Sequence, residues 1–339
     1  MNRVLLGLSG GVDSSATALL LKEMGFEVVG VYMKLHNNEA YHKENFQKAK
    51  RVADYFGIGI EFLDISQDFK REVYDYFVQA YQDGLTPNPC VVCNRTIKFG
   101  KMVEFADSLN IDFISTGHYV RSDERFIYKG IDESKDQSYF LSQINQNIIK
   151  RLIFPLGDKL KSDIKEIVKD ITPLKDIAIQ KESSEICFVE GDYTDILKEH
   201  MDIDIAGEVV DQNQNIIGTH KGYMHYTVGK RRGFRVYGAL EPHYVMGLNP
   251  KKNQIVVGKR DELLVDEVEL ESVNMFENLE EFEADVKIRY RTKGVKAKVK
   301  IKPNKKATIW LKEPVFGVAK GQFGVFYDGD RLLGGGVIV

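Results

Sequence analysis

Seven residues near the start of the chain have the types and spacing of a phosphate-binding loop. Ser9-Gly10-Gly11-Val12-Asp13-Ser14-Ser15 follows the apolar run 4–8 and precedes residues 16–24, which are rich in helix formers and end at Gly25. Two adjacent glycines let the backbone turn sharply and approach a ligand, while Asp13, Ser14 and Ser15 can cap the helix. Helix amide groups would then face an anion. The pattern predicts a strand, a tight loop and a helix that together hold phosphate.

This loop differs from the two best-known nucleotide-binding loops. It has no Gly-Lys-Ser/Thr ending of the Walker kind, and its spacing does not fit the dinucleotide fingerprint. Ser-Gly-Gly-Val-Asp-Ser resembles instead the pyrophosphate loop of the N-type ATP pyrophosphatases, which adenylate a substrate and release pyrophosphate. The alternative is an ordinary capped turn between strand and helix. Ligands of open α/β sheets bind at the carboxyl ends of strands, which favours a binding loop.

The second group of reactive residues is three cysteines, an odd number that favours thiol chemistry or metal binding over a disulfide framework. Cys90 and Cys93 form a C-x-x-C in an expected loop, 84–94, and a helix is expected to begin at Asn94 or Arg95. A thiolate beside a helix N-terminus is stabilised, so Cys93 is the better placed nucleophile. Cys187 lies near the end of the first predicted domain. The alternative for each is a buried, inert cysteine.

The elements that position these residues alternate between strand and helix. Expected strands are 4–8, 27–33, 60–64 and 111–116; expected helices are 41–56, 66–82 (with Ser66 or Asp68 as cap) and 96–109, followed by a helical region, 137–171. Such alternation predicts an α/β domain with a doubly wound parallel sheet, extending to residue 201. Gly117 and His118 end the fourth strand and would lie on the same sheet edge as the loop. His118 could be catalytic or structural.

Beyond residue 206 the apolar pattern becomes alternating. Hairpins are expected at 207–218 and 244–258, and they define a small β-rich central domain, 202–265. Short strands with Gly and Pro punctuation then predict a C-terminal β-barrel, 266–339. The first domain is 1–201.

Composition excludes several classes of protein. The chain has 339 residues, 43% hydrophobic and 29% charged, with a net charge of −3, so it reads as globular and shows no overall bias toward nucleic acid. It lacks the h-region of a signal peptide, and its apolar runs fall short of the ~20 residues that span a bilayer. We expect a cytoplasmic protein with no membrane partner.

Charge is nevertheless segregated. Residues 287–306 contain ten Lys or Arg and no acid, and the alternation in 295–302 places four lysines on one face of a strand. This face could bind a nucleic acid, or it could belong to an edge strand guarded by lysines. A second cluster, Lys230-Arg231-Arg232-Gly233-Phe234-Arg235, has Tyr226 and Phe234 nearby for base stacking. Two such clusters on separate β-modules could together hold one nucleic-acid partner.

Seven segments together carry a specific resemblance. They are Ser9 to Ser15, Thr86-Pro87-Asn88-Pro89, Cys93-Asn94-Arg95-Thr96-Ile97-Lys98-Phe99, Thr116-Gly117-His118-Tyr119-Val120-Arg121, Asp136-Gln137-Ser138-Tyr139-Phe140-Leu141, Ile186-Cys187-Phe188 and Leu333-Gly334-Gly335-Gly336. In this order they resemble the bacterial tRNA-uridine 2-sulfurtransferases, the tRNA-specific 2-thiouridylases, which thiolate the wobble uridine (U34). The resemblance implies a first domain of the N-type ATP pyrophosphatase kind, with ATP and Mg²⁺ as cofactors.

The resemblance also implies residue roles. ATP would bind Gly7, Leu8, Ser9, Gly10, Gly11, Val12, Asp13, Ser14, Met33 and Gly117. The anticodon arm of tRNA would contact Asn88, Pro89, Cys90, Lys135, Asp136, Gln137, Arg289 and Tyr290. Cys93 would be the nucleophile and Cys187 would carry a persulfide, loaded by a sulfur-donor protein or persulfide carrier. Cys93 can release that sulfur by forming a disulfide with Cys187, which must then be reduced. Asp13 could position Mg²⁺ or cap its helix, and Asp136 and Gln137 could orient the base or cap the helix that follows.

Two positions depart from the family pattern, and both leave alternatives open. Cys90 stands where many relatives have aspartate, and Glu185 stands where many have glycine. Cys90, Cys93 and Cys187 could hold a [4Fe-4S] cluster with one open iron, although four cysteines are usual, and zinc would need a fourth ligand. The rival functions are an adenylating ligase or amidotransferase with the same loop, and a non-catalytic tRNA-binding protein.

Overall fold

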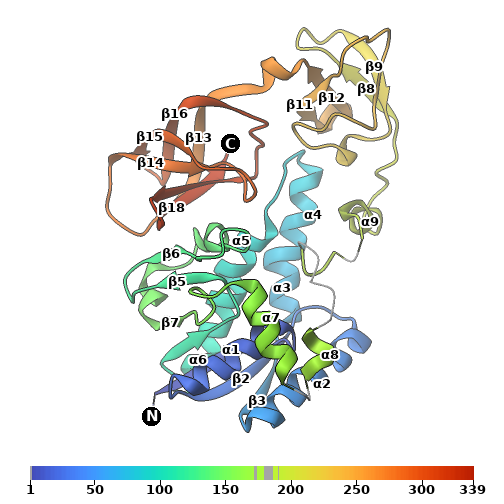
Figure 1. Cartoon of the computed structure of the whole chain (residues 1–339). Coiled ribbons are helices and arrows are strands. Elements are labelled where there is room, and N and C mark those ends of the chain that lie inside the picture. The colour runs from blue at the N-terminus through green and yellow to red at the C-terminus, as the bar shows by residue number, and fades with distance from the viewer. Residues whose placement is uncertain (1, 172–173, 179–185, 190) are drawn as a thin grey trace. The chain divides into compact units, whose positions relative to one another are not determined.

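The computed structural model describes residues 2–171, 174–178, 186–189 and 191–339 (Figure 1). The chain divides into two compact units that we describe separately. The first contains residues up to 73, 90–182 and 328–333, and the second contains 74–89, 183–327 and 334–339.

A five-stranded parallel sheet organises the first unit. Its strands are β1 (Arg3–Gly7), β2 (Glu27–Lys34), β3 (Gly59–Asp64), β4 (Phe113–Ser115) and β7 (Leu152–Ile153), in the order β3-β2-β1-β4-β7. All four pairings are parallel. The predicted doubly wound sheet is confirmed. The prediction missed β7, because its two residues lie within the region expected to be helical.

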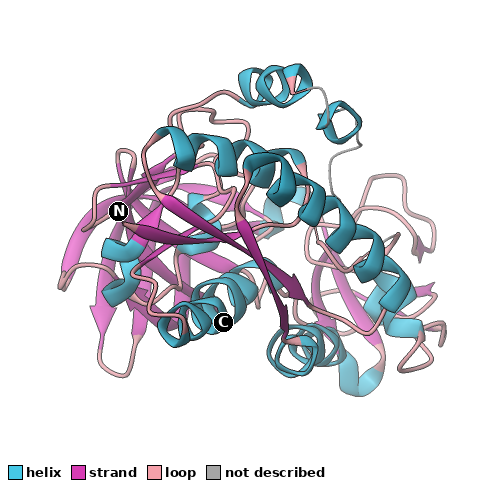
Figure 2. Cartoon of the chain, turned by 90° about the horizontal axis from the view of Figure 1, so that it is seen from below, coloured by secondary structure: helices cyan, strands magenta, loops and turns pink. Residues whose placement is uncertain are grey.

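Helices cover this sheet on both sides (Figure 2). In chain order the helices of the protein are α1 (Val12–Glu23), α2 (Glu39–Phe56), α3 (Ser66–Phe69), a π-helical stretch (Lys70–Tyr74), α4 (Asp75–Gln82), α5 (Pro89–Cys93), a second π-helical stretch (Asn94–Lys101), α6 (Met102–Ser108), α7 (Lys161–Asp170), α8 (Lys175–Ala178) and α9 (Tyr193–Lys198). Short 3₁₀ turns occupy Ser138–Leu141 and Gln146–Arg151, and a hairpin joins β5 (Val120–Ser122) to β6 (Ile127–Lys129). Apolar residues of β1, α1, α2 and α7 form one buried cluster.

Three predicted helix starts are wrong. The cap of α1 is Gly11, with no side-chain hydrogen bond, so Asp13, Ser14 and Ser15 lie inside the helix. Neither Ser66 nor Asp68 caps α3. Instead, the Asp64 carboxylate accepts a hydrogen bond from the Ser66 amide, the first amide of the helix, at 3.0 Å. The helix expected from residue 96 begins at Pro89, because proline with its fixed φ suits the first helical position.

The second unit contains a small sheet and a barrel. The sheet has the order β10-β9-β8-β12-β11, built from β8 (Gly207–Val210), β9 (Ile216–His220), β10 (Arg235–Val236), β11 (Tyr244–Asn249) and β12 (Gln254–Gly258). Both predicted hairpins are present as antiparallel pairs, β8 with β9 and β11 with β12. Val209, Tyr226, Val245, Ile255 and Val257 form its core.

The barrel consists of β13 (Leu264–Met275), β14 (Glu281–Lys287), β15 (Val295–Lys302), β16 (Lys306–Phe316), β17 (Phe323–Asp328) and β18 (Arg331–Ile338). They follow the order β13-β16-β15-β14-β17-β18, and β13 pairs back with β18, which closes the sheet and confirms the predicted barrel. Closure uses the glycines of β18: a Cβ on Gly334 would lie 2.1 Å from the Asn274 carbonyl oxygen. Within the described residues, no helix combines the length and apolar character needed to cross a membrane.

Candidate active site

The predicted phosphate loop lies where the order of the parallel sheet reverses. From β1 the chain goes outward through β2 and β3 on one side, then returns to place β4 and β7 on the other. Residues 8–11 follow β1, and Gly117 follows β4. Ligands of doubly wound sheets bind in the crevice at this reversal, outside the carboxyl ends of the strands. Topology therefore favours the binding loop over an ordinary turn.

Two glycines permit the close packing of this loop. Gly10 has φ +78°, and a Cβ there would lie 2.7 Å from the Ala49 amide nitrogen of α2. A Cβ on Gly117 would lie 3.0 Å from the Cβ of Asp13 and 3.2 Å from the Ser14 amide nitrogen. Gly10 needs glycine, since real Cβ atoms essentially never come within 3.0 Å of another heavy atom. At Gly117 a Cβ would force its neighbours to shift by a few tenths of an ångström.

The serines of the loop support α1 and leave its amino end without a side-chain cap. The hydroxyls of Ser14 and Ser15 donate to the Gly11 carbonyl at 3.1 and 2.8 Å, and the Ser9 hydroxyl lies 3.2 Å from that of Ser14. No side chain caps the helix start. The first amide groups of a helix and the positive end of its dipole attract anions. The residues present therefore fit a phosphate group.

The carboxylate of Asp13 is held by two residues from distant parts of the chain. Lys161 Nζ, at the start of α7, lies 2.5 Å from Asp13 Oδ1, and the Tyr119 hydroxyl donates to the same oxygen at 2.8 Å. Sequence reasoning did not find Lys161, since it lies 148 residues away and no local pattern marks it. The only hint in the sequence was that the loop itself contains no lysine, so that a cation near the phosphates would have to come from another part of the chain.

The other residues expected at the nucleotide lie on the same edge of the sheet. Gly7 ends β1, and the Leu8 amide donates to the Val31 carbonyl of β2 at 2.9 Å. Met33 is half-buried near the carboxyl end of β2. The structure thus brings together the ends of β1, β2 and β4, each with residues predicted to bind ATP.

Cys90 and Cys93 lie one turn apart in the helical run that starts at Pro89. Cys93 has helical φ and ψ of −59° and −43° and is 6% exposed, whereas Cys90 is half-buried in the first turn. The dipole effect weakens beyond the first turn. The argument that placed Cys93 beside a helix start therefore applies to Cys90 instead.

Cys187 belongs to the second unit and is exposed. Its neighbours hold it there: the Phe188 ring lies 5.4 Å from that of Phe77 and 5.8 Å from that of Tyr74, and Ile186 packs on the same apolar cluster. The Ile-Cys-Phe segment thus anchors two apolar side chains on the α4 region and presents a thiol between them. Glu185 lies outside the described residues.

The structure gives no support for a metal cluster held by Cys90, Cys93 and Cys187. Among the residues that the structure describes, no group of three or more His, Cys, Asp and Glu side chains could hold a metal ion.

Several residues expected to contact tRNA have structural partners. Asp136 is 5% exposed and accepts from the amides of Gly130 and Ser138 at 3.2 and 3.1 Å, which favours the capping role. The side-chain oxygen of Gln137 accepts from the Tyr119 amide at 3.0 Å. The Arg289 guanidinium donates to the carbonyls of Val228 and Gly317 at 3.0 and 2.7 Å, so it joins the central sheet region to the barrel. Tyr290 and Asn88 are half-buried, Pro89 is buried and Lys135 is partly exposed.

The loop before α5 is anchored by the barrel. The Thr86 amide donates to the Lys320 carbonyl at 2.8 Å, and the Gln322 side chain donates to the carbonyls of Thr86 and Pro87 at 3.0 and 3.2 Å. All of these residues belong to the second unit. The proline-rich segment that leads to Cys90 and Cys93 therefore has a fixed backbone at its start.

Comparison with known proteins gives full-length matches. Residues 2–191 match the model of a tRNA methyl transferase HUP domain, 194–259 a tRNA methyl transferase PRC-barrel domain, and 260–338 an aminomethyltransferase β-barrel domain. The chain is 51% identical over 336 residues to the tRNA-specific 2-thiouridylase MnmA of Sulfurimonas denitrificans, covering 99% of this chain and 98% of that protein. It is 52% identical to that of a Nitratiruptor species and 51% to that of Campylobacter jejuni, each with 99% of both chains covered.

The chain belongs to the tRNA-specific 2-thiouridylase family. The resemblance drawn from the seven sequence segments is thereby confirmed. In this 2-thiouridylase chain His118 is buried between the rings of Phe99 and Phe154, at 5.7 and 6.2 Å, and its Nδ1 lies 2.7 Å from the Thr116 hydroxyl. Burial, with a smaller contribution from Lys98, holds the pKa of His118 well below 6.5. A neutral, enclosed ring of this kind fits a structural role.

The lysine-rich strand of this 2-thiouridylase is β15, and the edge-strand interpretation is wrong because β15 lies between β14 and β16. Lys296 pairs with Asp285 of β14 at 2.9 Å, and Lys298 and Lys300 pair with Glu281 of β14 at 2.5 and 4.0 Å. Lys302 pairs with Glu269 of β13, beyond β16, at 3.1 Å. We call this set of ion pairs the charge ladder. The sequence could not reveal it, since the acids lie on other strands.

The Lys230 to Arg235 cluster is different, and we call it the basic loop. Arg231, Arg232 and Arg235 are exposed. In the part of the chain that the structure describes, these three arginines form no ion pair with an acid, and Arg235 lies over the Tyr237 ring at 5.8 Å. This loop keeps its positive charge.

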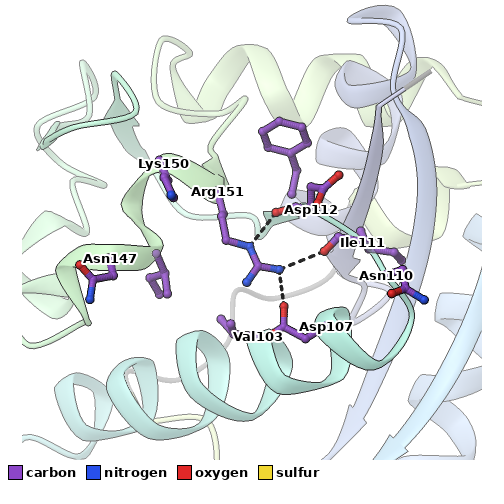
Figure 3. Close-up of a pocket in the computed structure, with 10 residues that line it drawn as sticks. Val103, Asp107, Asn110, Ile111, Asp112, Asn147, Lys150 and Arg151 are labelled. Carbon is purple, nitrogen blue, oxygen red and sulfur yellow. Dashed lines mark hydrogen bonds and ion pairs between the residues drawn. The ribbon is translucent and has the colours of Figure 1, made fainter.

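One pocket of about 800 Å³ lies away from the candidate site (Figure 3). It is lined by residues at the amino end of β4, among them Asp107, Asp112 and Arg151. Arg151 donates to the carbonyls of Asp112 and Ile111 at 2.7 and 3.0 Å and pairs with Asp107 at 2.7 Å. The guanidinium of Arg151 therefore links the walls of the pocket to one another. The pocket lies at the sheet edge opposite the phosphate loop.

Proposed function

We propose that this chain catalyses the ATP-dependent 2-thiolation of the wobble uridine, U34, in tRNA. The observation that carries the proposal is the uncapped start of α1 at the reversal of the parallel sheet, in a chain that matches 2-thiouridylases over its whole length. We also keep the division into a catalytic domain (1–201), a central tRNA-binding domain (202–265) and a barrel (266–339) as part of this proposal.

The first step is activation of the uridine. Residues 7–14 with Met33 and Gly117 bind ATP, and the C2 oxygen of uridine attacks the α-phosphorus, so that pyrophosphate leaves. The amides at the start of α1 stabilise the negative charge of the phosphates. Mg²⁺ would be held by phosphate oxygens together with the Asp13 carboxylate. Activation is needed because the C2 oxygen is a poor leaving group, whereas AMP is a good one.

The second step transfers sulfur. A donor protein or persulfide carrier places a sulfur atom on Cys187, and the Cys93 thiolate attacks the inner sulfur of that persulfide. The products are a disulfide between the two cysteines and hydrosulfide, which adds to C2 and displaces AMP. A thiol reductant then supplies two electrons to restore both cysteines. Exposure of Cys187 supports loading by an external donor.

Contacts with tRNA complete the proposal. The anticodon arm would lie against Asn88, Pro89, Cys90, Lys135, Gln137, Arg289 and Tyr290, with the basic loop contributing phosphate contacts. Because the carboxylate of Asp136 is enclosed, its contribution would be to shape the turn that carries Lys135 and Gln137.

Tests of this proposal measure two products in one reaction of purified protein, unmodified tRNA, ATP and a persulfide donor. We expect pyrophosphate release that depends on tRNA, and 2-thiouridine detected by retardation in a mercury-containing gel. Cys187→Ser should abolish thiolation and leave ATP binding intact. Thiolation that persists in this variant would overturn the persulfide role. Pyrophosphate release without tRNA would indicate another adenylating enzyme, and no release would indicate a non-catalytic binder.

A further inference from the structure

We propose that Cys90 is the resolving cysteine of the sulfur-transfer cycle: its thiolate attacks Cys93 in the disulfide that Cys93 has formed with Cys187, and Cys187 is released for another round. This inference rests on the proposed function, because that disulfide arises only when a persulfide on Cys187 has been cleaved. It gives a role to the one thiol that the two proposed steps leave unused.

Cys90 and Cys93 are neighbours on one helical run. The run begins at Pro89 and continues through the second π-helical stretch, with a kink at Phe99, into α6. Residues three apart on a helix lie on the same face, with their Cα atoms about 5 Å apart. Disulfides join Cα atoms over this distance. The Cβ atoms of such a pair are about 5–6 Å apart and have to approach by about 1–2 Å to form the bond.

The first turn of the run is the place where this approach costs least. Cys90 follows Pro89 directly, and the first amide groups of a helix have no intrahelical partner, so tightening the turn here breaks few hydrogen bonds. The Asn94 side-chain nitrogen donates to the Cys90 carbonyl at 2.9 Å. This hydrogen bond keeps the backbone of Cys90 close to the turn that follows Cys93.

Burial distinguishes the two cysteines in the way that a resolving pair requires. Val91 and Val92 between them are buried, and Cys93 is 6% exposed, whereas Cys90 is half-buried. A thiol reductant therefore reaches Cys90 more easily than Cys93. The position of Cys90 in the first turn also stabilises its thiolate, which is the form that attacks a disulfide.

The resolving step moves a disulfide without net oxidation. The Cys90 thiolate bonds to the Sγ of Cys93, the bond between Cys93 and Cys187 breaks, and Cys187 leaves as a thiolate that takes up the proton lost by Cys90. A thiol reductant then attacks Cys90, and a second reductant thiol completes the two-electron reduction. Strained and exposed disulfides are the readily reduced ones, so a bond across one helical turn favours this last step.

The competing explanation is direct reduction, in which an external thiol attacks Cys187 in the first disulfide and Cys90 only fills space in the turn. The two explanations differ in the disulfide that is present after one turnover. Resolution by Cys90 leaves Cys187 as a thiol, whereas direct reduction needs no bond between Cys90 and Cys93.

The test traps the disulfides after one turnover of the full chain. Cys187 is loaded with persulfide, excess donor is removed, and ATP and unmodified tRNA are added without a reductant. Thiols are then alkylated in acid, and trypsin places Cys90 and Cys93 in peptide 72–95 and Cys187 in peptide 182–198. We expect an internal disulfide in peptide 72–95 and an alkylated Cys187. Peptides joined only to each other, with Cys90 alkylated, would overturn the inference.

Cys187→Ser is the control for oxidation by air. This variant cannot form the first disulfide, so the same treatment should give peptide 72–95 with both cysteines alkylated. An internal disulfide of equal yield in this variant would also overturn the inference.

Steady-state thiolation with glutathione as reductant gives an independent readout. We expect Cys90→Ser to thiolate about one tRNA per enzyme and then to slow at least about tenfold relative to the unaltered protein, because a neighbouring thiol acts at a far higher effective concentration than a dissolved one. Excess dithiothreitol should restore turnover. A variant that keeps the unaltered rate with glutathione, or that dithiothreitol does not rescue, would contradict the role of Cys90. Failure of the proposed function would appear separately, as the absence of 2-thiouridine from the reaction of the unaltered protein.

Discussion

The phosphate loop and the charge ladder of the barrel both look like anion-binding regions in the sequence, but they differ in structure. At the loop, the helix amides are uncapped and a nearly buried lysine is held beside a single carboxylate. On the barrel, exposed lysines alternate with acids across three strand pairs. Exposed ion pairs contribute little to stability, and each lysine in such a pair already has its charge balanced by a carboxylate. Local charge composition alone therefore does not distinguish the two regions, whereas backbone geometry and burial favour the loop as the region that binds an anion.

In the phosphate loop, we expect the largest loss of activity from substitution of Gly10. Gly10→Ala should reduce tRNA-dependent pyrophosphate release by about a hundredfold or more, because the new Cβ would strike α2 at 2.7 Å and shift the amides from the phosphates. Stability should fall by about 1–3 kcal/mol. Gly25→Ala is the matched control, since Gly25 has a similar φ of +84° but open space around it. If both variants lose activity equally, the packing argument is wrong.

The contribution of the charge ladder to tRNA binding can be measured by comparing it with that of the basic loop. Arg231→Ala/Arg232→Ala in the basic loop should weaken tRNA binding several-fold and lower the slope of log K against log salt by about one per lost phosphate contact. Lys298→Glu/Lys300→Glu in the charge ladder should change the affinity less than about twofold, because these lysines already face Glu281. Filter binding over a salt series measures both. A larger effect in the ladder would reverse the assignment.

The two regions should also lose stability at different pH. Burial lowers the pKa of His118 well below 6.5 and that of His42 to about 4. The unfolded chain therefore binds more protons than the folded one below pH 6.5, and each histidine costs the first unit up to about 1.4 kcal/mol per pH unit as pH falls. In the barrel, a hydrogen bond from Lys298 lowers the pKa of Glu281. Burial raises the pKa of Glu269, but hydrogen bonds from Thr308 and Lys302 outweigh it and the pKa is lowered. The stability that these two carboxylates contribute is therefore lost only as pH falls below 4.5.

Trp310, the one tryptophan of the chain, lies in β16 and reports on the barrel by fluorescence, while hydrogen exchange of β1 and α1 reports on the first unit. Denaturant titrations from pH 7 to 4 should show the first unit weakening before the barrel. His118→Asn should reduce the slope between pH 6.5 and 5. An unchanged slope would mean that folding does not lower the pKa of His118.

Sequence patterns predicted what local spacing determines. The alternation of strands and helices, the loop after β1, both hairpins of the central sheet and the barrel were all visible, because each depends on residues within about one element of each other. The long-range partners were not. Lys161 reaches Asp13 across 148 positions, and the two residues of β7 are defined only by pairing with β4. Pro89 was assigned to a loop although proline also begins helices, and this displaced Cys93 by a full turn.

The anchoring of Thr86 and Pro87 by residues 320–322 has a consequence for how the protein matures. A chain emerging from the ribosome makes the parallel sheet and the segment before Cys90 long before it makes Gln322, which lies 236 positions after Thr86. The Ile338 amide in turn donates to the Gln322 carbonyl, so strand β18 must be in place to hold that residue. The segment leading to Cys90 and Cys93 therefore gains its anchor only after the strands of the barrel have been made, which couples the order of this segment to the folding of the barrel.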